Sequence, residues 1–398
     1  MQLRPHQTKA VKAMLRNTKG QIIIPTGGGK TMCMIDDAMN EFSRTVSPKT
    51  IVVVAPRILL ANQLSAEFLY HNLDGNYNIT VNVMHVHSGE THHFSTTKVD
   101  EIRQFNYDTA CDEKHLLIFT TYNSLHKIQE SNIVVDTIYF DEAHNSVQKN
   151  FFPATEHFSH FAERCYYFTA TPKHSRTPSK AGMNWPEYGQ VICQVPAPKL
   201  VKEGYILPPK VEVYQSRILQ KDELVIDRDC EQMIDSIDNI SKSKVLICAK
   251  ATKQIINLVS HTTFVQDLAD RGYSWMTITS KTGAIIDGEK VDREEFFNTL
   301  NAWGKDITKK FVVLHHSILS EGINVNGLEA VLFLRNMDYI GISQTIGRVI
   351  RLGDATKTFG LVCIPVYSKV GISTSRKVQA VVDTVFKDGQ PAISIVNN

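Results

Sequence analysis

The sequence predicts an α/β protein with two tandem domains, each built on a mostly parallel sheet with helices on both faces. Its 398 residues are enough for two domains that each bury a core. Short apolar runs of strand length alternate with amphipathic stretches of helical length, which is typical of a parallel sheet. These runs fall into two sets with a proline-rich stretch between them, so we expect two sheets.

The composition excludes several classes of protein. Lysine and arginine number 43 against 41 aspartates and glutamates, so the net charge is only +2 and any nucleic-acid surface must be a local groove. A hydrophobic content of 42% excludes a disordered chain, and no run approaches the roughly 18 apolar residues of a membrane span. The seven cysteines are scattered, which disfavours a zinc or iron–sulfur site and fits a reducing, cytoplasmic compartment.

Five strands are expected in each half of the chain. In the first half they are Gln21–Ile24, Ile51–Ala55, Leu116–Thr120, Thr137–Phe140 and Cys165–Phe168. In the second half they are Lys244–Cys248, Trp275–Thr279, Lys310–His315, Ala330–Leu334 and Gly360–Val366. A last helical pattern covers Ser375–Phe386.

Two irregular stretches interrupt this pattern. Residues 195–209 are rich in proline, which neither a helix interior nor a central strand accepts. We therefore expect domains at residues 1–198 and 213–398 with a linker at 199–212; a long surface loop within one domain is the alternative. Residues 85–115 are polar and hold five of the fifteen histidines, and a solvated loop is expected there rather than a metal site.

A phosphate-binding loop is expected between the first strand and the helical pattern Met32–Phe42. The segment reads Pro25-Thr26-Gly27-Gly28-Gly29-Lys30-Thr31. Glycines let backbone N–H groups surround a phosphate, and the helix N-terminus adds partial positive charge. Lys30 would reach the β- and γ-phosphates of ATP, and the Thr31 hydroxyl would bind Mg²⁺. Ile24 stands where the general pattern has Gly or Ala.

An acidic pair follows the strand Thr137–Phe140. Asp141 would hold Mg²⁺ through water, and Glu142 would orient and polarise the attacking water. Taken alone, Asp-Glu at a strand end fits a helix cap or a solvated turn equally well. Together with the phosphate loop upstream, the pair predicts catalysis by Lys30, Asp141 and Glu142.

The acidic pair continues as Asp141-Glu142-Ala143-His144, which resembles motif II of the superfamily 2 helicases and translocases of DEAH type. Other segments resemble further motifs of that family in the same order. They are residues 25–31 (motif I), 55–63 (Ia), 120–125 (Ib), 169–172 (III), 320–324 (V) and 344–351 (VI). The resemblance spans residues 1–352 and implies two RecA-like domains that use ATP and Mg²⁺.

The resemblance also implies roles at motif VI and at motif V. Arg348 and Arg351, three residues apart, would share one face of a helix and serve as arginine fingers at the γ-phosphate. Gln344 would face the γ-phosphate or its water. Gly322 and Asn324 are candidates for the nucleotide site in motif V, although Asn324 replaces the usual Asp.

Adenine recognition is implied at the N-terminus, because the family places a glutamine over the base. Gln7 is the candidate, with Arg4 beside it. A glutamine amide can donate to adenine N7 and accept from its N6 amine.

A nucleic-acid groove is implied across both domains, with contacts to phosphates that position the strand without reading its sequence. The matching positions are Arg57, Thr120, Thr121, Ser280, Lys281, Thr282 and Gly283. Thr169, Thr171 and His144 would couple this groove to the ATP site. The basic residues between 173 and 180 could flank the groove or form a solvated loop.

The opening Leu3–Gln7 and residues 200–209 resemble the type III restriction (ResIII-like) branch, which includes phage UvsW-like branch-migration helicases and restriction motor subunits. This implies a helicase or translocase that acts on single-stranded, duplex or branched DNA. Its process would be DNA repair or recombination, and its source could be a virus or phage. An RNA helicase and a non-hydrolysing nucleotide-gated clamp are the alternatives. We expect a monomer away from membranes, with a nuclease, a methyltransferase or a replication or repair protein as partner.

Overall fold

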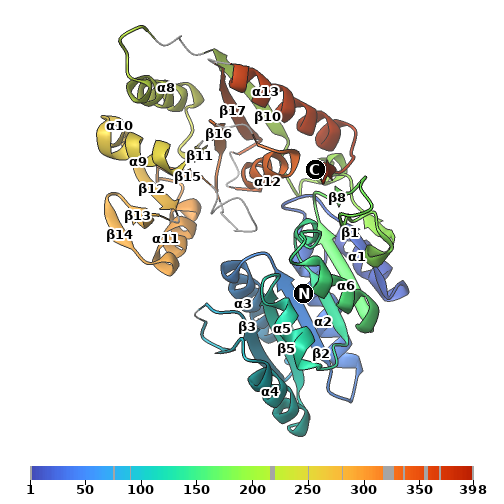
Figure 1. The fold of residues 1–398 in the computed structure, drawn as a ribbon. Helices are drawn as coiled ribbons and strands as arrows, with labels where there is room; N and C mark the ends of the chain where they lie inside the picture. Colours follow the sequence, from blue (N-terminus) through green and yellow to red (C-terminus); the bar gives the residue numbers. More distant parts are fainter. Residues whose placement is uncertain are drawn as a thin grey trace. The chain divides into compact units, whose positions relative to one another are not determined.

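The computed structural model describes residues 2–74, 77–89, 91–215, 220–249, 251–279, 281–316, 327–334, 337–353, 357–366 and 369–396. The chain forms two compact units (Figure 1): residues 1–195 together with 393–398, and residues 196–392. Each unit contains an eight-stranded sheet that is wholly or mostly parallel and carries helices on its faces. The predicted α/β class is therefore confirmed.

The sheet of the first unit has the order β4-β3-β5-β2-β6-β7-β1-β9, and the pairings described are parallel. Its strands are β1 (Lys19–Ile23), β2 (Thr50–Ala55), β3 (Val81–Val86), β4 (Phe94–Ser95), β5 (His115–Thr121), β6 (Thr137–Phe140), β7 (Arg164–Thr169) and β9 (Val191–Gln194). The helices are α1 (Pro5–Arg16), α2 (Lys30–Arg44), α3 (Ile58–Asp74), α4 (Val99–Cys111), α5 (Leu125–Ser131) and α6 (Phe152–Phe161). The central strands are almost fully buried because helices cover both faces of the sheet.

The sheet of the second unit has the order β10-β17-β16-β11-β15-β12-β13-β14. Its strands are β10 (Pro209–Gln215), β11 (Lys244–Cys248), β12 (Ser274–Thr279), β13 (Gly283–Ile286), β14 (Glu289–Val291), β15 (Phe311–His315), β16 (Ala330–Phe333) and β17 (Gly360–Val366). The helices are α7 (Ala197–Lys202), α8 (Val225–Ile240), α9 (Thr252–His261), α10 (Phe264–Asp270), α11 (Arg293–Lys305), α12 (Tyr339–Val349) and α13 (Lys369–Val382). The antiparallel hairpin β13–β14 turns at Asp287-Gly288, both with positive φ, as a two-residue hairpin turn requires.

The two stretches expected to be irregular are largely ordered. Residues 85–115 hold the end of β3, β4 and α4, and their first two histidines are buried, so the expected solvated loop is wrong. Residues 199–212, expected as a linker, lie in the second unit as part of α7 and the start of β10. Prolines fit there because Pro198 lies in the first turn of a helix and Pro209 begins an edge strand.

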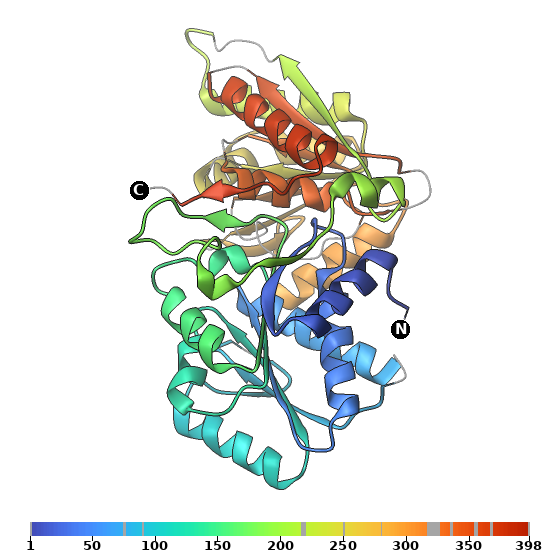
Figure 2. The ribbon, with the colours of Figure 1, turned by 90° about the vertical axis from the view of Figure 1, so that its right-hand side faces the viewer.

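A small separate sheet forms where the chain's last described residues meet the first unit. Strand β18 (Ser394–Ile395) pairs in parallel with β8 (Lys173–His174). Figure 2 shows the red β18 beside the green β8. The basic segment after residue 172 therefore begins as a paired strand.

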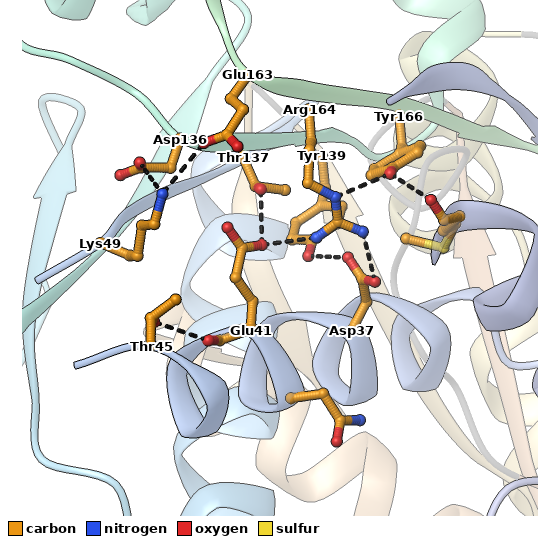
Figure 3. A network of polar contacts seen from close by, with 12 residues as sticks. Asp37, Glu41, Thr45, Lys49, Asp136, Thr137, Tyr139, Glu163, Arg164 and Tyr166 are labelled. Carbon is orange, nitrogen blue, oxygen red and sulfur yellow. Dashed lines mark hydrogen bonds and ion pairs between the residues drawn. The ribbon is translucent and has the colours of Figure 1, made fainter. Parts of the chain in front are cut away.

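A buried polar network joins α2 to the amino ends of β6 and β7 (Figure 3). Arg164 donates from Nη2 to Asp37 at 2.8 Å and from Nη1 to Glu41 at 2.7 Å. Tyr139 donates its hydroxyl to Asp37 at 2.6 Å, and Thr137 donates to Glu41 at 2.7 Å. Burial raises the pKa of Glu41, although Thr137 and Arg164 oppose the shift. The network fixes α2 against two strands at their amino ends.

Candidate nucleotide and nucleic-acid site

The glycine-rich segment connects β1 to α2. Gly27 and Gly29 have φ of 82° and 81°, a left-handed conformation that glycine adopts without strain. The N–H of Gly28 donates to Pro25 O at 2.9 Å, which closes the turn. Gly29 immediately precedes α2, so the segment ends at a helix N-terminus, where backbone N–H groups attract anions.

The segment fits a bound phosphate. Thr26 Oγ1 is buried and has no hydrogen-bond partner among the residues that the structure describes, so a phosphate oxygen would satisfy it. Lys30 is largely buried, and its Nζ lies 3.6 Å from Glu142 Oε1. These groups supply a hydroxyl and a cation, and the first turn of α2 adds its partial positive charge.

The acidic pair lies at the carboxyl end of β6, a central strand between β2 and β7. Both Asp141 and Glu142 are buried. Burial and the neighbouring Glu142 charge raise the pKa of Asp141 to about 7, and Lys30 opposes the shift. Glu142 has φ of 46°, an unusual conformation for a residue other than glycine and one that often marks functional positions. Sequence patterns give no signal for this strained backbone.

Magnesium fits this donor set. Asp141 and Thr31 offer the oxygen ligands that Mg²⁺ prefers, and this ion usually keeps several waters. Within the described part of the chain, no group of three or more His, Cys, Asp and Glu side chains forms a metal site. A site with few protein ligands is therefore the kind that these residues can build.

His144 joins the acidic pair to the end of β7. Its Nδ1 lies 3.0 Å from Thr169 Oγ1 and 3.3 Å from Thr171 Oγ1. The same nitrogen lies 3.6 Å from Glu142 Oε2. The structure thus brings together the three residues predicted to couple the two sites, His144, Thr169 and Thr171.

The start of α1 packs on the phosphate loop. Gln7 donates from Nε2 to Gly29 O at 3.2 Å and accepts from the backbone N–H of Arg4 at 2.8 Å. His6 Nε2 lies 2.7 Å from Gly28 O. To contact adenine, the Gln7 side-chain amide would have to replace its bonds to Gly29 and Arg4 with bonds to the base. Sequence reasoning missed His6, whose only signal was its place beside Gln7.

The nucleic-acid candidates of the first unit differ in exposure. Arg57 is exposed just before α3. Thr120 and Thr121 are buried, and the Thr120 hydroxyl donates to Val86 O at 2.8 Å. A phosphate contact through the Thr120 hydroxyl would break this bond, so Arg57 is the candidate best placed to meet a ligand.

In the second unit, the candidates between β12 and β13 form a turn. The hydroxyls of Thr282 and Thr279 lie 2.7 Å apart, and the N–H of Lys281 donates to Thr279 Oγ1. Gly283 has φ of 75° and begins β13. Ser280 lies outside the described residues, as do Gly322 and Asn324.

Gln344 and Arg348 lie on α12 and are buried. The expectation that Arg348 and Arg351 share one helix face is wrong, because α12 ends at Val349 and Arg351 lies beyond it. The backbone carbonyl of Arg351 accepts from Lys357 Nζ at 2.7 Å. The turn after α12 therefore sets the position of Arg351.

A histidine relay lies at the carboxyl end of β3. The N–H of Gly89 donates to His87 Nδ1, so a neutral His87 carries its proton on Nε2, which lies 3.0 Å from His85 Nδ1. His85 Nε2 in turn lies 3.1 Å from Ser65 Oγ. Burial lowers the pKa of His85 to about 3, which keeps the relay neutral.

Two kinds of comparison relate this chain to known proteins. Residues 1–174 match the family model described as type III restriction enzyme, res subunit. No curated protein matches the sequence. In the described part of the chain, no helix combines the length and apolar character needed to cross a membrane.

The whole chain resembles parts of larger solved structures. It matches the type ISP restriction-modification enzyme LlaBIII bound to DNA with a TM-score of 0.76 and 18% identity, covering 100% of this chain and 31% of that one. A nuclease-deletion mutant of the type ISP enzyme LlaGI with a DNA substrate mimic gives 0.67 and 20%, covering 99% and 30%. Helicase Lhr of Mycobacterium smegmatis, bound to ssDNA and AMP-PNP, gives 0.64 and 16%, covering 96% and 48%. This chain spans about a third of the length of the type ISP enzymes and about half that of Lhr.

Proposed function

On the premise that residues 1–174 form a ResIII domain of helicase type, we propose that this protein hydrolyses ATP with Mg²⁺ and couples hydrolysis to movement on DNA. The observation that carries the proposal is the meeting of the phosphate loop with the acidic pair. Lys30 Nζ lies 3.6 Å from Glu142 Oε1, at the carboxyl ends of parallel strands where ligands of open α/β sheets bind.

Each residue of the first unit has a defined task in this proposal. Lys30, Thr26 and the backbone of the loop would hold the phosphates, and Asp141 with Thr31 would hold Mg²⁺, partly through water. ATP supplies the phosphoanhydride bond that is cleaved. Glu142 orients the attacking water and accepts its proton, and the cationic Lys30 side chain stabilises negative charge on the phosphates.

The second unit would contribute positive charge to the same reaction. Arg348 and Arg351 would act as arginine fingers, and Gln344 would orient the water. Burial of Gln344 and Arg348 on α12 restricts their side-chain freedom, which suits groups that must meet a ligand in one geometry. Asn324 would contribute to the nucleotide site in motif V without the negative charge of the aspartate that is usual there.

DNA is the proposed track, because the similar structures LlaBIII and Lhr are bound to DNA. Arg57 and the turn at residues 281–283 would contact the phosphates, so binding would tolerate any sequence and fall steeply with salt. This chain spans about a third of the type ISP enzymes, so we propose that the motor works with a nuclease or methyltransferase.

The decisive experiment measures ATP hydrolysis at fixed low salt without polynucleotide and with single-stranded DNA, duplex DNA, branched DNA and RNA. The variants are Glu142→Gln and Lys30→Ala, with Glu163→Gln as the matched control because Glu163 is mostly exposed and far along the chain from either motif. We expect a DNA-specific rise in rate that both site variants lose and the control keeps.

The other outcomes distinguish the alternatives. A rise with RNA alone would replace the DNA motor by an RNA helicase. Nucleotide binding without hydrolysis under any condition would support a nucleotide-gated clamp and would contradict the proposed function.

A further inference from the structure

The end of the described chain is hydrogen-bonded to the exit of the Thr169–Pro172 segment. The backbone N–H of Ser394 donates to Pro172 O at 3.1 Å, and that of Val396 donates to His174 O at 2.8 Å. Strand β18 thereby lies beside β8, as Figure 2 shows. These bonds hold the backbone immediately after Thr171.

An apolar contact reinforces the pairing. Val396 is half-buried and packs against the core cluster of the first unit, which includes residues of β2, β5, β6 and β7. A two-residue strand alone would be marginal, because so few ladder bonds cannot offset the ordering of the chain. The Val396 side chain gives residues 393–396 a second point of attachment, and we name these four residues the strap.

The strap follows the second unit with almost no intervening chain. Ala392 is buried and is the last residue of the second unit, whereas Ile393 already belongs to the first. The N–H of Gln390 donates to Thr384 O at 3.0 Å, so the preceding turn is also fixed. A single residue, Ile393, thus separates the second unit from the hydrogen bond to Pro172.

From Pro172 the path to the proposed catalytic carboxylate is short. The Thr171 hydroxyl lies 3.3 Å from His144 Nδ1, which lies 3.6 Å from Glu142 Oε2. The backbone N–H of Thr171 donates to Thr169 Oγ1 at 3.0 Å, so a shift of Pro172 would disturb both hydroxyls around the imidazole. Two residues, Pro172 and Thr171, therefore connect the strap to His144, whose imidazole faces Glu142.

We propose that the strap is a positioning segment that ties the second unit to His144 through Pro172 and Thr171. This inference rests on the proposed function, because the position of His144 affects catalysis only if Glu142 is the catalytic carboxylate. The strap is the second covalent connection between the two units, besides Val195–Pro196. The strap contacts neither ATP nor DNA in this proposal and acts only through the Thr169–Pro172 segment.

Proline variants test the strap, because proline removes a backbone N–H. Ser394→Pro deletes the bond to Pro172, whereas Ile395→Pro is the matched control, since the ladder uses the N–H groups of residues 394 and 396. The first readout is amide hydrogen exchange at Val396. Loss of one ladder bond should raise its exchange rate about fivefold in Ser394→Pro and leave it unchanged in Ile395→Pro.

The second readout is the imidazole NMR signal of His144, assigned by its loss in His144→Gln. Ser394→Pro should shift this signal, and Ile395→Pro should leave it in place. The third readout is the steady-state kinetics of ATP hydrolysis, in which kcat and KM for ATP are measured separately. We expect the DNA-stimulated kcat of Ser394→Pro to fall about fivefold with KM for ATP unchanged, as expected for a loss of about one hydrogen bond in positioning.

The outcomes separate this inference from the proposed function. An unchanged exchange rate in Ser394→Pro would overturn the strap itself. Faster exchange with an unmoved His144 signal would overturn its positioning role. If the wild-type protein hydrolyses no ATP, the proposed function fails, and the exchange and NMR results still decide whether the strap positions His144.

Discussion

Replacing Arg164 by methionine should lower the free energy of unfolding of the first unit by about 3–5 kcal/mol, the range measured when one partner of a buried ion pair is removed. Arg164 donates to Asp37 at 2.8 Å and to Glu41 at 2.7 Å. The Asp37 side chain is 0% exposed and that of Glu41 is 11% exposed. Water therefore cannot replace the guanidinium at Asp37, and a buried carboxylate loses its counter-charge.

The loss should depend on pH in a defined direction. Burial already raises the pKa of Glu41, so between its ordinary and raised values the folded state binds more protons than the unfolded state and stability falls as pH rises. Removing Arg164 takes away a positive charge and raises this pKa further. The destabilisation by Arg164→Met should therefore be larger at pH 8 than at pH 5.

Urea unfolding of the full chain measures both effects. Of the three tryptophans, Trp185 lies in the first unit, so its fluorescence reports that unit once Trp275 and Trp303 are replaced by phenylalanine. Arg103→Met is the matched control, because the ion pair of Arg103 with Asp100 is exposed, at 53% and 94% of the two side chains, and should contribute about 1 kcal/mol or less. A loss below about 1 kcal/mol for Arg164→Met, or one independent of pH, would refute the reasoning.

Two further predictions follow from the candidate site. The first unit should lose stability as pH falls below about 6.5, because His85, with a pKa near 3, cannot take up the proton that it binds when unfolded; urea midpoints at pH 7 and pH 5 should differ less in His85→Asn. Gly29→Ala should weaken binding of a fluorescent ATP analogue, because its Cβ would lie 2.3 Å from Gln7 Nε2 and would displace the side chain that is the candidate for adenine contact. Gly204→Ala has a similar positive φ with nothing within 4 Å, so it should show the backbone strain of about 1–2 kcal/mol without the loss of affinity.

The strands in the middle of each sheet could be predicted from the sequence, whereas the outermost one or two strands on each side could not. All ten expected strands are present, because helices cover both faces and force nearly every side chain of a central strand to be apolar. Edge strands such as β10 and β14 carry exposed charges, so their sequences contain no continuous apolar run. Strands β4, β8 and β18 have two residues each and are too short to form one. The solvated-loop expectation for residues 85–115 failed for the related reason that histidine counts as polar, although a relay of hydrogen bonds buries it.

The residues of the candidate site also differ in how well the sequence predicts them. The phosphate loop and the acidic pair are contiguous segments at strand ends, so residue type and spacing predicted where they would lie. The Arg164–Asp37 pair spans 127 residues, and the Ser394–Pro172 bond joins two residues that are 222 positions apart in the chain. Such partners are ordinary polar residues in the sequence, and only the packing of their elements reveals them.

The arrangement of the first unit suggests why its two ends differ so much in chemistry. The elements α2, β6 and β7 carry Lys30, the acidic pair and Thr169 at one end. There Glu142 has a strained φ, Asp141 has a raised pKa, and the Thr26 hydroxyl has no hydrogen-bond partner among the described residues. Each of these features disfavours the folded state. At the other end, the same three elements are joined by the network around Arg164, with its donors and acceptors matched. A rigid attachment at one end lets the opposite end keep groups that the proposed ligands, ATP and Mg²⁺, would satisfy. A variant that weakens the network should therefore impair nucleotide binding before the unit unfolds.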